Sequence, residues 1–117
     1  MSLVLVDHPL AQHYLTHLRD ESTQPDRFRR FAKHLTTLLV VEATRQVKTK
    51  SQAVTTPIQP TSGPVLANGL AAVPILRAGL AMLEPVLELF PDVAVGYIGL
   101  ERDEETAQAR RYYAKLP

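Results

Sequence analysis

The sequence predicts an α/β fold, in which a parallel sheet carries flanking helices. Two continuously apolar segments, residues 70–76 and 93–100, are typical of strands that are buried on both faces of such a sheet. A helical pattern separates them, so residues 70–100 are predicted to form one βαβ unit with a right-handed crossover. A parallel sheet usually has more than two strands, and two cannot cover the apolar faces of the predicted helices. Either the chain is a fragment or a partner completes the sheet, and we interpret these 117 residues as half of a fold.

The composition is that of a globular protein and excludes several functional classes. Hydrophobic residues make up 45% and charged residues 21%, with a formal net charge of +1; this argues against disorder and against mainly non-specific nucleic-acid binding. The sequence has no cysteine, which excludes disulfides, thiolate metal sites and a cysteine nucleophile. Its apolar runs are shorter than a signal peptide or a membrane span requires, so we expect a cytoplasmic protein with no membrane partner.

Residues 1–47 are predicted to be helical. A first helix occupies residues 9–19 and carries a proline in its first turn. A second helix begins at residue 25, after a hydroxyl cap, and ends near Val47. Its basic face could meet an anionic effector, but we expect it to be solvated or paired with acids. Its apolar face consists of Phe28, Phe31, Ala32, Leu35, Leu38, Leu39 and Ala43, and its other side of Arg27, Arg29, Arg30, Lys33 and His34.

Residues 48–69 are predicted to form an irregular hairpin on the surface. Alternating segments there indicate short strands, and several prolines and glycines interrupt them.

Two prolines indicate where the first strand of the βαβ unit ends and where its helix begins. Pro74 has no N–H to donate and suits the end of the first strand better than its middle. Residues 77–79 make the turn, and Pro85 implies that the following helix either starts late, near Met82, or is kinked. This helix runs to about residue 89 and is expected to direct Leu80, Leu83, Val86, Leu87 and Phe90 inward.

A candidate anion site lies where the two predicted strands end. Arg77 and Arg102 follow these strands, and ligands of open α/β sheets bind beyond the carboxyl ends of the strands. Ala78 and Gly79 allow close backbone approach, and the helix start behind them offers free N–H groups. Two arginines at one edge could hold a phosphate or pyrophosphate in bidentate fashion, or could form ordinary surface salt bridges.

The segment Val-Pro-Ile-Leu-Arg-Ala-Gly-Leu at residues 73–80 closely resembles the diphosphate-binding loop of uracil phosphoribosyltransferases. The resemblance covers nearly the whole chain. It implies the type I phosphoribosyltransferase architecture, with residues 1–117 as the N-terminal portion of one domain and residues 101–117 as the start of a β-arm. The weaker matches are His8-Pro9-Leu10, Phe28-Arg29, Glu42-Ala43-Thr44-Arg45, Arg102-Asp103-Glu104-Glu105-Thr106 and Tyr112-Tyr113-Ala114-Lys115-Leu116-Pro117.

The resemblance implies an activity in pyrimidine salvage: transfer of the 5-phosphoribosyl group from 5-phosphoribosyl 1-diphosphate to uracil, giving UMP and diphosphate. It implies Mg²⁺, held chiefly by substrate oxygens. Arg77 and Arg102 match the family's residues for 5-phosphoribosyl 1-diphosphate, and Ala78 and Gly79 would support the diphosphate loop. Some phosphoribosyltransferases have a non-proline cis peptide in this loop, for which Arg77–Ala78 and Ala78–Gly79 are the candidate bonds.

Two segments of the family pattern have no match in this sequence. They are the ribose-phosphate loop, an acidic residue followed by Thr-Gly-Gly, and the uracil-reading segment, so no catalytic residue is identified and we expect the 117 residues to be inactive alone. The resemblance also implies GTP binding and a homodimer or higher homo-oligomer, while regulation by GTP and base preference stay open. The competing interpretation is a non-catalytic α/β module that binds a phosphate-bearing ligand through the same arginines, or a partner through a sheet edge.

Three other groups of side chains could have a function, but each also has an ordinary structural explanation. His13 and His17 lie four apart on a helix, but no third metal ligand has suitable spacing, so we expect surface or partner-facing histidines. The acidic run at 103–105 could hold a cation but is more typical of a solvated arm. Tyr112 and Tyr113, on the same arm, could cap a binding site or an interface. The resemblance implies that this arm helps to hold a dimer, so we expect the interface.

Overall fold

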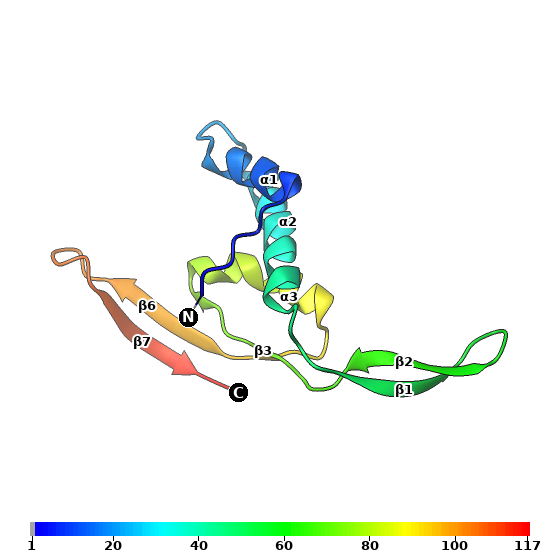
Figure 1. Ribbon diagram of the computed structural model, residues 1–117. Helices are drawn as coiled ribbons and strands as arrows, with labels where there is room; N and C mark the ends of the chain where they lie inside the picture. The colour runs from blue at the N-terminus through cyan, green and yellow to red at the C-terminus, as the bar shows by residue number, and fades with distance from the viewer. Residues whose placement is uncertain (1) are drawn as a thin grey trace.

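The computed structural model describes residues 2–117 and confirms the α/β class (Figure 1). The helices lie on one side of a set of short sheets, and two hairpins extend from this body in opposite directions. In chain order the elements are α1 (Pro9–Arg19), α2 (Pro25–Ala43), β1 (Thr49–Thr55), β2 (Pro60–Leu66), β3 (Ala71–Ala72), β4 (Ile75–Leu76), the 3-10 helix η1 (Ala78–Met82), α3 (Leu83–Leu89), β5 (Ala94–Val95), β6 (Tyr97–Arg102) and β7 (Ala109–Lys115).

A parallel ladder joins the two strand segments of the βαβ unit, as predicted. β3 pairs with β5 and β4 with β6, in one register that sets Leu76 opposite Gly99. The N–H groups of Ala94, Gly96 and Ile98 donate to the carbonyls of Leu70, Ala72 and Pro74 over 3.0, 3.0 and 3.2 Å. The prediction of one continuous strand ending near Pro74 is wrong. Pro74 lies between β3 and β4 and divides the strand, because it accepts a ladder bond but can donate none.

The crossover between the parallel strands is a 3-10 helix followed by an α-helix. η1 spans five residues, and α3 begins only at Leu83. This confirms the late start that Pro85 implied, because proline is accepted in the first turn of an α-helix, where its missing N–H is not needed. Pro85 is itself fully buried.

α2 lies between α1 and the η1–α3 segment and contacts both. The buried Thr36 hydroxyl donates to the carbonyl of Ala32 over 2.7 Å, so its burial leaves no unpaired polar group. Lys33 Nζ lies 3.2 Å from Glu84 Oε1 and 3.8 Å from Glu88 Oε1, which ties α2 to α3. Part of the predicted basic face is therefore paired with acids.

α2 ends at Ala43, and the predicted end near Val47 is wrong. Thr44 leaves the helix, and its hydroxyl donates to the carbonyl of Val40 over 2.8 Å. Arg45 turns back and places Nη2 2.6 Å from Glu42 Oε2. These side-chain bonds replace the contacts that a further helical turn would supply.

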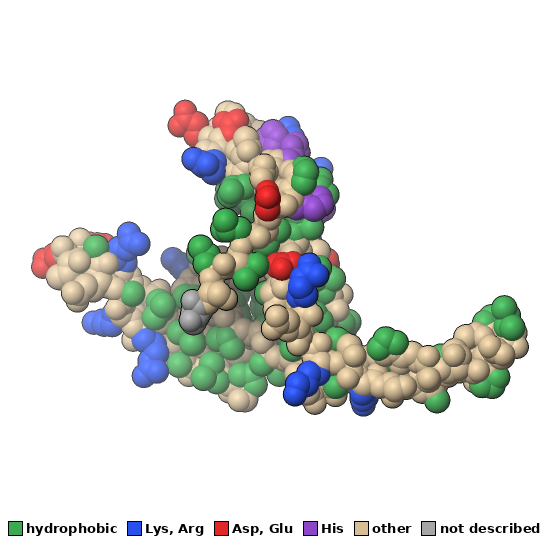
Figure 2. Space-filling model, viewed as in Figure 1, with side chains coloured by type: hydrophobic (Ala, Val, Ile, Leu, Met, Phe, Trp, Pro, Cys, Tyr) green, Lys and Arg blue, Asp and Glu red, His purple; other side chains and the backbone are tan. Residues whose placement is uncertain are grey.

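The sheet is covered on one face only, so the prediction of strands buried on both faces is also wrong. Pro74 is buried on the helix side, whereas Val73 and Ile75 are 38% and 51% exposed. The reason is the single crossover: α1, α2 and α3 all lie on the same side of the strands, and no described residue covers the other (Figures 1 and 2). Several predicted core residues of the helices are likewise more than one-third exposed: Phe28, Leu39, Leu80 and Leu87.

The β1–β2 hairpin is regular, which corrects the expectation of an irregular one. Seven consecutive residue pairs run from Thr49 opposite Leu66 to Thr55 opposite Pro60. In an antiparallel pair, hydrogen-bonded residue pairs alternate with non-hydrogen-bonded ones. The Ala67 N–H donates to the Lys48 carbonyl over 3.0 Å, which identifies that pair, and every second pair after it, as hydrogen-bonded. Pro60 and Pro64 consequently occupy non-bonded positions, where the N–H would point away from β1, and they delete no ladder bond.

β6 and β7 form the predicted arm. They pair antiparallel from Tyr97 opposite Lys115 to Arg102 opposite Ala109, with a bulge between Gly99 and Leu100. The two hairpins extend the molecule: the Cα radius of gyration is 18.3 Å, against about 13 Å for a compact chain of this length.

Replacing Gly96 by alanine is expected to disturb the end of the arm. A Cβ at Gly96 would lie 2.8 Å from the Lys115 carbonyl oxygen and 2.7 Å from Pro117 Cδ, so the backbone after β7 must move. We expect Gly96→Ala to lower the free energy of unfolding by about 1–3 kcal/mol, measured by denaturant unfolding, and to lower amide protection of Ala114. Gly63→Ala is the control, because a Cβ there has no neighbour within 4 Å. Equal stability of the two variants would contradict this packing.

Candidate anion-binding site

Arg77 lies at the carboxyl end of β4, directly before η1. Its carbonyl accepts a hydrogen bond from the Leu80 N–H over 3.1 Å, which closes the first turn of η1. The Leu76–Arg77 peptide bond is cis. The sequence had placed a cis bond one or two residues later, at Arg77–Ala78 or Ala78–Gly79, and this was wrong. The chain reverses at the strand–helix junction itself, and the residues after it already belong to the 3-10 turn.

Arg77 borders a cavity of about 610 Å³ at this edge of the sheet. The cavity is lined by Arg77, Ala78, Leu100, Glu101 and Tyr112, which come from the β4–η1 junction, β6 and β7. The parallel register explains the grouping, since Leu76 opposite Gly99 brings the next residues, Arg77 and Leu100, alongside each other. The carboxyl ends of the two parallel strands thus form one open site.

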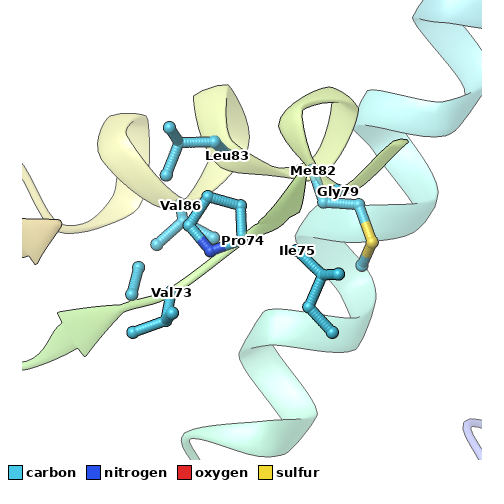
Figure 3. Close-up of a pocket in the computed structure, with 8 residues that line it drawn as sticks. Val73, Pro74, Ile75, Gly79, Met82, Leu83 and Val86 are labelled. Atoms are coloured by element: carbon cyan, nitrogen blue, oxygen red, sulfur yellow. The ribbon is translucent and has the colours of Figure 1, made fainter. Parts of the chain in front are cut away.

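Arg102 and Gly79 lie away from the lining of this cavity. Arg102 is the last residue of β6 and pairs with Ala109 at the base of the arm's loop. Gly79 faces the other way: a Cβ added to it would lie 3.4 Å from the Pro74 carbonyl carbon. Gly79 lines a separate apolar cavity of about 300 Å³ between β4 and α3, shown in Figure 3, together with Ala72, Val73, Pro74, Ile75, Met82, Leu83 and Val86.

Charges of both signs lie at this edge of the sheet. Glu101, the acid in the cavity lining, has its Oε1 3.0 Å from Arg110 Nη2 across the arm. This pair offsets the carboxylate that would otherwise repel an anion beside Arg77. Arg102 and Arg111 stand on the same two strands, and Figure 2 shows Lys and Arg side chains gathered along the arm.

Tyr112 lines the cavity, whereas the sequence favours an interface over the binding site that it also allows for this residue. It is the extra residue of the β6–β7 bulge, and its ring lies directly over Gly99. A glycine inside a strand often marks a bulge or a close approach. Gly99 is therefore the sequence feature that could have indicated a close approach here, but the sequence does not show which side chain packs on it.

Asp103 stabilises the loop of the arm rather than standing free to bind a cation. Its Oδ1 accepts hydrogen bonds from the N–H groups of Glu105 at 2.8 Å and Thr106 at 2.9 Å. Bonds from the Thr106 and Glu105 backbone hold the pKa of the Asp103 carboxyl below its ordinary value of 3.8. The loop also places Ala107 at φ 58°, a left-handed conformation that is unfavourable for alanine.

His13 and His17 belong to an aromatic cluster between α1 and α2. Their ring centroids are 4.7 Å apart, and the two rings lie 5.9 and 5.2 Å from that of Phe31. Within residues 2–117, no group of three or more His, Asp or Glu side chains is placed to hold a metal ion. No helix in the same residues combines the length and apolar character needed to cross a membrane.

Comparison with known proteins identifies relatives along the full chain. A family model described as uracil phosphoribosyltransferase matches residues 4–117. Curated proteins named uracil phosphoribosyltransferase are similar: that of Dictyoglomus turgidum is 49% identical over 98% of this chain, and that of Thermus thermophilus 48% identical over 100%. The alignments cover 56% and 57% of those proteins, so this chain spans little more than half of their length.

A solved structure shares the fold. The AQ2163 protein from Aquifex aeolicus superposes with a TM-score of 0.90 at 35% sequence identity, over 99% of this chain and 56% of that one. The elements described above therefore correspond to one continuous part of a larger known fold.

Removing the Asp103 carboxylate is expected to loosen the arm's loop. Asp103→Ala removes the acceptor of two backbone N–H groups, so amide exchange at Glu105 and Thr106 should accelerate. Asp103→Asn is the control, because its amide oxygen can still accept both bonds. Since folding lowers the Asp103 pKa, the loop's stabilisation is present above pH 3.8 and is lost as the pH falls through the lower folded value. Unchanged exchange in Asp103→Ala would contradict this role.

Proposed function

Because the chain belongs to the uracil phosphoribosyltransferase family, we propose that the whole protein transfers the 5-phosphoribosyl group from 5-phosphoribosyl 1-diphosphate to uracil, forming UMP and releasing diphosphate. Since the chain spans 56% of its Dictyoglomus turgidum relative, this activity is proposed for the whole protein, and the 117 residues are proposed to supply its diphosphate-binding part.

One observation carries the proposal: Arg77 borders an open cavity at the carboxyl ends of two adjacent parallel strands. An arginine there presents a planar guanidinium that matches two oxygens of a phosphate group. The ion pair of Glu101 with Arg110 reduces repulsion of an anion at the same place. The cavity, about 610 Å³, is large enough for a sugar diphosphate.

The charge at this edge suits the reaction. When the bond between the anomeric carbon and the diphosphate breaks, its electron pair leaves with the diphosphate oxygen, and the ribose gains oxocarbenium character. A ring nitrogen of uracil then forms the new bond to the anomeric carbon, and its N–H proton is released. A guanidinium that is already positioned on the diphosphate stabilises the negative charge as it develops, without reorganisation. Arg77 has this role in the proposal, and Arg102, at the end of the neighbouring strand, adds to the positive field.

Mg²⁺ fits the site as a partner of the substrate. The lining of the Arg77 cavity includes one carboxylate, that of Glu101, and this group is already paired with Arg110. Magnesium commonly keeps few protein ligands and binds substrate phosphate oxygens. The diphosphate oxygens would therefore hold the ion, and when bound it would add positive charge to the leaving group.

Three further properties are proposed: two rest on the family resemblance, and the cytoplasmic location rests on the short apolar runs of the sequence. The whole protein is proposed to be cytoplasmic, to bind GTP and to form a homodimer or higher homo-oligomer.

Arg77→Ala is expected to weaken binding of inorganic diphosphate about tenfold or more, because a charged bidentate contact is lost. Titration calorimetry on the 117-residue chain, with Mg²⁺ present, measures this directly. Arg19→Ala is the control, since Arg19 lies at the end of α1, outside the cavity lining. Equal loss of affinity in both variants would show that general charge, rather than the site, attracts the ligand.

Transfer itself is tested in a chimera. Residues 1–117 replace the matching part of the Dictyoglomus turgidum protein, and UMP formation from labelled uracil is measured. We expect activity in the chimera, a loss of at least about tenfold in kcat/KM with Arg77→Ala, and none in the 117-residue chain alone. A folded chimera that binds 5-phosphoribosyl 1-diphosphate but forms no UMP would favour the non-catalytic binding module instead.

A further inference from the structure

Tyr112 occupies an unusual position in the arm. In a regular antiparallel pair each residue of β7 would face one residue of β6, but the pairing passes from Arg111 opposite Leu100 to Tyr113 opposite Gly99. Tyr112 is the residue left over. A bulge of this kind redirects a side chain relative to the regular alternation of the strand.

The redirected ring rests on β6. A Cβ at Gly99 would lie 2.6 Å from the Tyr112 Cζ atom and 2.7 Å from Cε2, so only glycine leaves room for the ring there. Gly99 is also the register partner of Leu76, the residue before Arg77. The ring therefore lies at the same point along the sheet as the β4–η1 junction.

The result is a cavity with two chemically different walls. Arg77 supplies a cation and Tyr112 supplies an aromatic surface, and both line the same space of about 610 Å³. Tyr112 is 50% exposed, so its ring is accessible from solvent. A guanidinium alone suits any phosphate, whereas a cation beside an aromatic face suits a ligand with both an anionic group and an apolar ring face.

We propose that Tyr112 is a binding residue for the sugar ring of a phosphorylated sugar whose diphosphate is held by Arg77. The carbon–hydrogen face of a ribose ring is weakly apolar and packs on aromatic rings. The proposal deepens the proposed function and rests on it, because it names the part of the same ligand that each wall contacts. Tyr112 thereby distinguishes a ribosyl diphosphate from free diphosphate.

The test compares two ligands on the chimera of residues 1–117 with the Dictyoglomus turgidum protein, in one Mg²⁺-containing buffer: inorganic diphosphate and 5-phosphoribosyl 1-diphosphate. Tyr112→Ala is expected to weaken the ribosyl ligand about three- to tenfold and to change diphosphate affinity by less than about twofold. Arg77→Ala is expected to weaken both. Tyr112→Phe keeps the ring and should recover most of the affinity for the ribosyl ligand.

Two further variants separate the ring from the fold. Gly99→Ala displaces the ring while keeping the tyrosine, and should reproduce the selective loss of Tyr112→Ala. Tyr113→Ala is the matched control, since Tyr113 is the adjacent tyrosine, is 43% exposed and does not line the cavity. In the unaltered chain, the NMR signals of the Tyr112 ring should shift with the ribosyl ligand and stay in place with diphosphate.

Each failure has a different meaning. If Tyr112→Ala leaves affinity for the ribosyl ligand unchanged, or weakens both ligands equally, the role of Tyr112 is overturned and the proposed function stands. If the chimera binds neither ligand, the proposed function and this inference are overturned together.

Discussion

The parallel register between β4 and β6 is the constraint on which the site depends. Three backbone hydrogen bonds, from Ala94, Gly96 and Ile98, keep the two strand segments aligned across the break at Pro74. A shift by one residue would move every side chain of β4 to the opposite face. It would also separate Arg77 from Leu100 and Tyr112, and the cavity with its two chemically different walls would no longer exist. Backbone pairing therefore places side chains that are remote in sequence.

The arm also positions a side chain of the site, because the bulge in β7 places the Tyr112 ring beside Arg77. Without the bulge, β7 would present its side chains in strict alternation, and the ring of Tyr112 would have no place over Gly99. The Glu101–Arg110 pair joins the same two strands beside it. Charge, ring and strand pairing are thus coupled, because each depends on the β6–β7 ladder. A substitution that disturbs the β6–β7 pairing is therefore expected to alter the cavity beside Arg77.

Local patterns were sufficient to predict much of the fold and part of the site. Helical periodicity predicted α1 and the start of α2, and Pro85 indicated the late start of α3. Two apolar segments predicted the parallel strand pair that carries Arg77. Two of the errors concern features that depend on distant parts of the chain. Burial of Val73 and Ile75 depends on what lies over the sheet, and the position of the Tyr112 ring depends on a one-residue offset between strands. Neither is encoded in the spacing of neighbouring residues.

The placement of Pro60 and Pro64 gives the β1–β2 hairpin two unequal edges. Both prolines stand where an outward N–H would otherwise be offered, so the outer edge of β2 lacks donors at these two positions, while β1 keeps its own at Thr49, Ser51, Ala53 and Thr55. Another strand can therefore add to β1 but meets an incomplete row of donors on β2. Growth by edge-to-edge stacking needs two usable edges on every molecule. The outer edge of β2 is therefore a poorer template for an added strand than the outer edge of β1, which makes growth of a fibre through this hairpin less favourable.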